Sequence, residues 1–192
     1  MDIQTFDTQL LLLINRGAVN GPFDVLMPAL SARGYLLIIP FILAMLFRGA
    51  IQKNKQGKTY FPTALWTIAI AVCALYFSQW VVDTIKITVA RERPCRAIEG
   101  IRLIVACPKS FSMPSSHTIM SFAAAIPFFY LTKKIITLSW RLYPLLLASF
   151  IAFSRLYLGV HYPTDVVAGI LLGAVIGMGL SLLYQVMNSN GE

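Results

Sequence analysis

Long uninterrupted runs of apolar side chains are the main feature of the hydrophobic pattern in this sequence. Five such runs occur, near residues 34–47, 61–82, 114–131, 143–158 and 164–187. Runs of this kind predict helices that cross a membrane, because lipid offers no water to pair with backbone polar groups. They lack the period-two alternation of a membrane β-barrel strand. The pattern therefore predicts an all-α, polytopic transmembrane helical bundle.

The N-terminal part of the pattern is less regular. A hydrocarbon core about 30 Å thick needs about 20 residues per helix, so we expect the first span to begin earlier than residue 34, near Pro22. Apolar side chains share one helical face within residues 3–16, at Ile3, Phe6, Leu10, Leu13 and Ile14. This spacing predicts an amphipathic segment along the membrane, with a frayed tail as the alternative. We expect one domain, residues 1–192, with five spans, or six if residues 9–33 contain another.

Composition and charge support a membrane protein and orient it. Hydrophobic residues make up 57% of the chain and charged residues 12%, against about 45–50% and about 25% in soluble domains, which argues against a soluble cytosolic enzyme. The net charge is +8. Two loops carry basic residues without acids: Arg48, Lys53, Lys55 and Lys58 in one, and Lys133, Lys134 and Arg141 in the other. The positive-inside rule places both loops in the cytoplasm, which leaves residues 83–113 and 159–163 on the outer face.

The chain has two histidines, and both lie where a predicted span meets the outer face. A single histidine, His117 or His161, would more often be a satisfied polar contact than a catalyst. Two histidines at the same membrane face favour catalysis. His161 also has Asp165 four residues later. A carboxylate in that position can fix the imidazole tautomer and leave the other ring nitrogen free as a nucleophile.

Three basic residues are expected near the histidines. Lys86 and Arg93 are seven residues apart, so one helix that ends at Pro94 would place both on the same face. Arg155 lies near the outer end of the fourth run, where an isolated guanidinium is costly without a partner. Each cation could instead reach out to the membrane interface. Together with two histidines, however, the three favour an anion site.

The start of the third run adds uncharged donors. Ser115 and Ser116 follow Pro114, and a helix N-terminus presents unpaired N–H groups that suit a phosphate. Ordinary helix capping explains the same residues. A metal site is disfavoured because the three cations would repel a divalent ion and could neutralise a phosphoryl group themselves. We therefore expect no metal and no cofactor.

Two further patterns concern folding and assembly. Cys95 and Cys107 both lie in the outer segment, where a disulfide and free thiols are equally supported. The last run carries glycines at four-residue spacing, at Gly169, Gly173 and Gly177. Such a face lets another helix approach closely. Packing within a monomer is favoured over dimerisation.

These residues resemble the motifs of the type-2 phosphatidate phosphatase superfamily of membrane lipid phosphatases. The family's K-x6-R-P, P-S-G-H and S-R-x5-H-x3-D patterns are similar to Lys86–Pro94, Pro114–His117 and Ser154–Asp165 here. Ser116 stands where the family has glycine, which keeps the backbone N–H and adds a hydroxyl. Family members often have six spans, which bears on the N-terminal topology.

The resemblance implies a mechanism and a set of residue roles. His161 would attack phosphorus and form a phosphohistidine, His117 would protonate the leaving oxygen, and Asp165 would orient His161. The phosphoryl oxygens would be held by Lys86, Arg93, Arg155, Ser115 and Ser116. Because one histidine must be neutral and the other protonated, we expect a bell-shaped pH profile.

The predicted substrate is a membrane lipid phosphate or pyrophosphate, because a cationic pocket at the interface can hold the headgroup while the tail stays in lipid. Candidates are undecaprenyl pyrophosphate, phosphatidylglycerophosphate, phosphatidic acid and lipid A 1-phosphate. We expect a bacterial inner-membrane location with the site facing the periplasm and no nucleic-acid partner. A monomer is favoured, with a dimer as the alternative. The alternatives are a lipid phosphotransferase and a non-catalytic protein that binds or transports anionic lipids.

Overall fold

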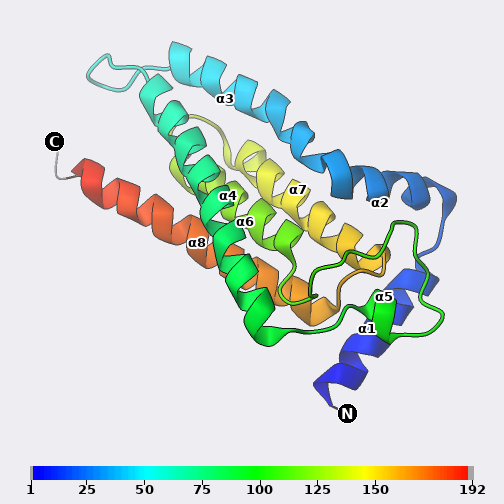
Figure 1. Ribbon diagram of the computed structural model, residues 1–192. Helices are drawn as coiled ribbons and strands as arrows, with labels where there is room; N and C mark the ends of the chain where they lie inside the picture. The colour runs from blue at the N-terminus through cyan, green and yellow to red at the C-terminus, as the bar shows by residue number, and fades with distance from the viewer. Residues whose placement is uncertain (1, 190–192) are drawn as a thin grey trace.

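The computed structural model describes residues 2–189, and within that range the fold is helical (Figure 1). The only β pairing there is one isolated bridge between Lys53 and Thr59. The helices in chain order are α1 (Ile3–Gly17), α2 (Gly21–Arg33), η1 (Gly34–Leu37), α3 (Ile38–Ile51), α4 (Phe61–Val89), α5 (Pro94–Ala97), α6 (Ser116–Leu131), α7 (Leu138–Tyr157) and α8 (Pro163–Ser189). The predicted all-α helical bundle is confirmed.

The first membrane run is longer than its apolar core suggested. Helices α2, η1 and α3 follow each other without a gap over Gly21–Ile51, so this run begins near Pro22, as expected. The Asn20 side chain caps α2 by accepting the Phe23 backbone N–H at 2.8 Å. Three runs within the described residues are long and apolar enough to cross a membrane: Gly21–Ile51, Phe61–Ala97 and Pro163–Asn188. Helix α6 is shorter, and α7 has 20 residues.

The predicted end of the second span is wrong in one respect. Helix α4 stops at Val89, and Ala90 takes a left-handed backbone conformation with φ of 48°. Pro94 does not end α4 but begins the short helix α5, with Arg93 as its N-cap. Lys86 and Arg93 are therefore not on one face of a single helix. They reach the same region from two segments, because the chain turns between them.

Helix α6 lies at the centre, between α4, α7 and α8 (Figure 1). Helix α8 approaches it through the predicted glycine face. A Cβ atom at Gly173 would lie 2.5 Å from the Ile119 carbonyl oxygen, and one at Gly177 would lie 2.6 Å from the Ala123 carbonyl oxygen. The glycine face therefore packs within the monomer, and it brings the N-termini of α6 and α8 together.

The close approach of α8 to α6 predicts a stability difference between two glycine variants of α8. We expect Gly173→Ala to lower the free energy of unfolding by about 1–3 kcal/mol, because the new methyl overlaps the α6 backbone. Gly179→Ala is the matched control, since its Cβ would meet nothing within 4 Å and alanine favours helix. Thermal unfolding in detergent measures both, and equal melting temperatures would contradict the packing.

The two ends of the bundle differ in what they carry. The basic loop between α3 and α4 and the C-terminal end of α8 lie at one end, and α1, α5 and the long segment before α6 lie at the other (Figure 1). The Arg48 Nε donates to the Ile135 carbonyl at 3.3 Å, which ties the two predicted cytoplasmic loops together. The segments with the candidate site residues are at the opposite end, as the charge pattern predicted.

Helix α1 exposes its apolar face and buries a face that contains polar side chains. Its outward face is apolar, with Ile3 and Leu13 75% and 69% exposed, as a membrane-surface helix requires. Its inward face holds Asp7, Leu11 and Asn15, each fully buried. Asn15 Nδ2 donates to the backbone carbonyls of Arg102 and Tyr157 at 2.9 and 2.8 Å. The polar side chains of α1 therefore dock it onto the protein.

Candidate active site

Two of the predicted motifs, Pro114–His117 and Ser154–Asp165, meet where α6 and α8 begin. The Ser115 backbone N–H donates to the Asp165 carbonyl at 3.1 Å, which joins the start of α6 to the first turn of α8. His161 precedes α8 by two residues and is 1% exposed. His117, in the first turn of α6, is exposed. His161 is thus enclosed by protein, and His117 is accessible from outside.

The imidazole of His161 lies between a cation and a carboxylate. Its Nε2 is 2.9 Å from Arg93 Nη1, and because a guanidinium can only donate, Nε2 is the acceptor and carries the lone pair. Its Nδ1 therefore bears the proton and faces Asp165 Oδ2 at 3.4 Å. That separation is longer than a normal hydrogen bond, and Nδ1 has no other partner. The pair is a long electrostatic contact that fixes the tautomer.

The surroundings of His161 favour its neutral form. Burial, and then the nearby charges of Arg93 and Arg155, lower the pKa of His161 to about 3, against the opposing effect of Asp165. The ring is therefore uncharged at neutral pH in the empty site. Its lone pair points towards Arg93.

Asp165 is held from several directions and is fully buried. Its Oδ2 accepts the Tyr162 backbone N–H at 2.8 Å and a short hydrogen bond from the Ser112 hydroxyl. Its Oδ1 accepts Arg91 Nη1 at 2.8 Å. These bonds leave the carboxylate few ways to rotate, so its position relative to His161 is set by the fold.

The three predicted cations lie within electrostatic range of one another. Arg93 is anchored by its Nε to the Ser110 carbonyl at 2.7 Å and by its Nη1 to the Val160 carbonyl at 2.8 Å. Lys86 Nζ donates to the Phe111 carbonyl at 2.5 Å. Arg155 is 5% exposed and donates to the Ser31 hydroxyl, and its Nε has no partner. Unpaired, buried donors of this kind suit an anionic ligand.

The N-terminus of α6 faces the same region. Ser115 is its N-cap and is fully buried, but its side chain makes no capping hydrogen bond. Its oxygen accepts the Thr118 hydroxyl at 2.9 Å instead, which leaves the Ser115 proton available. The backbone N–H groups of Ser116 and His117 belong to the first turn, which has no partners within the helix. His117 lies within electrostatic range of Lys86, Arg93 and Arg155.

A disulfide joins α5 to the segment before α6. Cys95 and Cys107 are bonded in the structure, with their Cα atoms 6.0 Å apart. Ser110 and Phe111, whose backbone carbonyls hold Arg93 and Lys86, lie three and four residues after Cys107. The bridge therefore lies next to the segment that positions two of the cations.

Four contributors were not predicted from the sequence. Asp7, Ser31, Arg91 and Ser112 were not singled out for the site. An acid inside the predicted amphipathic segment, residues 3–16, was the one available signal for Asp7. Within residues 2–189, no three His, Cys, Asp or Glu side chains are grouped as metal ligands would be.

Comparison with known proteins assigns the family. A model of the PAP2 superfamily matches residues 64–190, about two thirds of the chain. This chain belongs to the PAP2 superfamily. A lipid A 4'-phosphatase of Bacteroides thetaiotaomicron is 31% identical over 95% of this chain and 77% of its own length. A putative undecaprenyl-diphosphatase of Escherichia coli, YbjG, is 25% identical over 96% and 86%.

Solved PAP2 structures share the fold. The crystal structure of Aquifex aeolicus LpxE has a TM-score of 0.69 and 25% identity, covering 90% of this chain and 92% of its own. The PAP2-type phosphatidylglycerolphosphate phosphatase of Bacillus subtilis has a TM-score of 0.68 and 20% identity, covering 95% and 86%. The protein is therefore a membrane-bound lipid phosphatase of the PAP2 superfamily, as its motifs predicted.

Proposed function

We propose that this PAP2 enzyme hydrolyses a lipid phosphate or lipid pyrophosphate through a phosphohistidine on His161, without a metal ion, at the outer face of a bacterial inner membrane. The observation that carries the proposal is the orientation of His161. Its protonated Nδ1 faces Asp165, and its lone pair on Nε2 faces Arg93.

The proposed reaction has two steps. In the first, Nε2 of His161 gives up its hydrogen bond from Arg93 Nη1 and forms a bond to phosphorus while the bond from phosphorus to the lipid oxygen breaks, and His117 gives that oxygen a proton. The freed Arg93 Nη1 can then donate to a phosphoryl oxygen. In the second, His117 takes a proton from water, and the hydroxyl oxygen displaces His161 to release inorganic phosphate. Asp165 stabilises the positive charge that develops on His161, and Lys86, Arg93 and Arg155 stabilise the phosphoryl oxygens.

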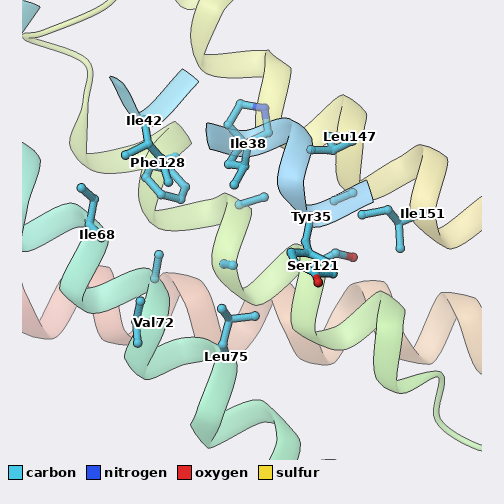
Figure 2. Close-up of a pocket in the computed structure, with 15 residues that line it drawn as sticks. Tyr35, Ile38, Ile42, Ile68, Val72, Leu75, Ser121, Phe128, Leu147 and Ile151 are labelled. Carbon is cyan, nitrogen blue, oxygen red and sulfur yellow. The ribbon is translucent and has the colours of Figure 1, made fainter. Parts of the chain in front are cut away.

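An apolar cavity supports a substrate with a lipid tail. It has a volume of about 160 Å³ and is bounded by η1, α3, α4, α6 and α7 (Figure 2). Ser121 and Ile151 line it, and they lie one helical turn from His117 and Arg155 on the same helices. Val72, in its wall, is 44% exposed. A tail in this cavity would enter from the bilayer and leave its phosphate at the cations.

The relatives support a substrate from the cell envelope. Two relatives named above are described as a lipid A 4'-phosphatase and a putative undecaprenyl-diphosphatase, and phosphatidylglycerophosphate is a candidate from the sequence. We propose a lipid of this group, with phosphatidic acid as a further candidate. All share one or more phosphate groups next to a long apolar tail. The runner-up is a phosphotransferase that passes the phosphoryl group from His161 to an acceptor lipid.

Release of inorganic phosphate by the purified protein tests this function. We expect release from at least one of these lipids in detergent, with a chelator present and no acceptor lipid, and inhibition by vanadate. Transfer only when an acceptor is added would favour the phosphotransferase. Binding of the lipids without turnover would favour the non-catalytic alternative. Loss of activity with chelator that is restored by a metal would contradict the metal-free mechanism.

Chain length tests the cavity separately. We expect Val72→Trp to raise KM for a long-chain substrate but not for a short-chain analogue, because the indole occupies space next to the tail. Val175→Trp is the matched control, since Val175 is 70% exposed on α8 and does not line this cavity. Equal effects of the two variants would place the tail elsewhere.

A further inference from the structure

Asp7 of α1 is a fully buried carboxylate that lies outside all three motifs and outside the residues matched by the family model. Its Oδ1 accepts the Thr164 backbone N–H at 2.9 Å. Its Oδ2 accepts Arg91 Nη2 at 2.6 Å and a short hydrogen bond from the Thr164 hydroxyl. A buried carboxylate is costly unless it is fully paired, and here both oxygens are used.

Arg91 connects Asp7 to the candidate active site. The guanidinium donates through Nη2 to Asp7 and through Nη1 to Asp165 Oδ1, at 2.6 and 2.8 Å. Nη1 also donates to the Thr164 hydroxyl at 2.7 Å, and the planar group lies 3.9 Å from the Tyr162 ring centroid. A guanidinium held at both nitrogens has a fixed plane. Asp7 therefore determines where Arg91 presents its other nitrogen.

The chain of contacts continues to the proposed nucleophile. Arg91 occupies Oδ1 of Asp165, and Oδ2 of the same carboxylate faces Nδ1 of His161. Because that last contact is already 3.4 Å long, a small rotation of the carboxylate would weaken it further. Asp7 also offsets part of the positive charge of Arg91, which pairs with both Asp7 and Asp165. Without Asp7, that charge would act on Asp165 alone and make it a weaker acceptor for the His161 proton.

We propose that Asp7 is a positioning residue that acts through Arg91 and Asp165 to hold His161 in its reactive tautomer and orientation. This inference rests on the proposed function, because it takes His161 as the nucleophile. The proposal adds α1, which lies outside the three motifs, to the elements that orient His161. Asp7 does not touch the substrate. Its loss should therefore reduce the chemical step and leave phosphate binding intact.

The direct test is Asp7→Asn, which keeps the shape and removes the charge. We expect kcat for lipid phosphate hydrolysis to fall about 10-fold, the lower end of the range for partners that contact a metal ligand directly, because Arg91 and Asp165 separate Asp7 from His161. KM and the inhibition constant of vanadate should stay within about twofold, since Lys86, Arg93 and Arg155 are unchanged. A rise in KM without loss of kcat, or no change in either, would overturn the proposal.

A control separates positioning from simple docking of α1. Leu11 is fully buried on the same face of the helix, so Leu11→Ala weakens packing without touching the charges. We expect it to lower the melting temperature and keep kcat. If both variants lose kcat in proportion to melting temperature, Asp7 only docks the helix, and the proposal fails.

Coupling with Arg91 provides a second route if Asp7→Asn folds poorly. Arg91→Gln removes the bridge but leaves Thr164 available to pair with Asp7. We expect it to lower kcat with KM unchanged, and the double variant to be no slower than Arg91→Gln alone, because both act through one contact. Independent, additive losses would contradict the proposal.

The chain has two histidines, which makes a spectroscopic readout practical. In ¹⁵N-histidine-labelled protein we expect the His161 signals of the wild type to report a protonated Nδ1, and those of Asp7→Asn to shift towards a mixture of tautomers. An unchanged spectrum together with unchanged kcat would refute the role of Asp7. By contrast, a wild type without phosphate release on any lipid would refute the proposed function itself.

Discussion

His161→Ala should lower kcat by about 10⁴-fold or more, the scale seen when an enzyme loses its nucleophile. The physical reason is that the buried, neutral ring holds a nucleophilic nitrogen lone pair 2.9 Å from Arg93 Nη1, beside the cations that would bind the phosphoryl group. Phosphate release from the lipid substrate measures the loss. Labelled substrate should also leave no acid-labile phosphate on the variant protein.

His117→Ala provides the comparison for this prediction. As a proton donor, His117 should contribute about 10²- to 10⁴-fold, and the loss should shrink with a leaving group that needs no proton. The phosphoenzyme should still form in this variant with such a substrate. Turnover that survives His161→Ala, or equal leaving-group dependence for the two variants, would contradict the assigned roles.

The pH dependence of kcat/KM follows from the state of His161. Its pKa in the empty site is lowered to about 3, below the ordinary value near 6.5. A nucleophile is lost when it gains a proton, so kcat/KM should not fall through titration of His161 until the pH is well below 6.5. Substrate ionisation is controlled by comparing substrates with different phosphate pKa values. An acid limb fixed near 6.5 for all of them would contradict the buried, neutral ring.

Arg93→Lys is the second variant with a large expected effect. We expect kcat/KM to fall about 10²- to 10³-fold, the range for the loss of one donor to a developing oxyanion. Arg93 uses Nε, Nη1 and Nη2 to hold Ser110 and Val160 while it faces His161. Lysine has the charge but not this planar set of donors, so it cannot both hold the two loops and meet the phosphoryl group.

Arg96→Lys is the matched control for Arg93→Lys. Arg96 is exposed, lies three residues further along and donates to the Pro108 carbonyl at 2.5 Å. The same substitution there should leave kcat/KM within about twofold, as expected for an exposed residue away from the chemistry. If lysine at position 93 were also tolerated, positive charge alone would be sufficient for activity, and the planar set of guanidinium donors would not matter.

Much of the site was predictable because its signals are local. In Pro114–His117 and His161–Asp165, the spacing of the residues along short segments already determines which groups meet at a helix start. The four-residue spacing from His161 to Asp165 predicted their contact, and the structure places them 3.4 Å apart. The glycines of α8 likewise predicted a close helix contact that the packing on α6 contains.

Other features depended on residues far apart in the chain. The turn at Ala90 takes Arg93 off the axis of α4, and no periodicity in the sequence marks it. Arg91 was indistinguishable from a solvated surface charge until its partners, Asp7 and Asp165, were placed beside it. Apolar spacing in α1 identified the outward face but not what its inward face would contact.

By itself, the sequence determined the class of this protein: its apolar runs require membrane helices, and its three motifs identify a PAP2 phosphatase. Only the tertiary structure decided which side chains surround His161 and in what orientation, including the link through Arg91 to Asp7. The reason is physical. Hydropathy and helical spacing act between neighbours in the chain, whereas the partners of a buried charge are decided by which distant segments pack around it.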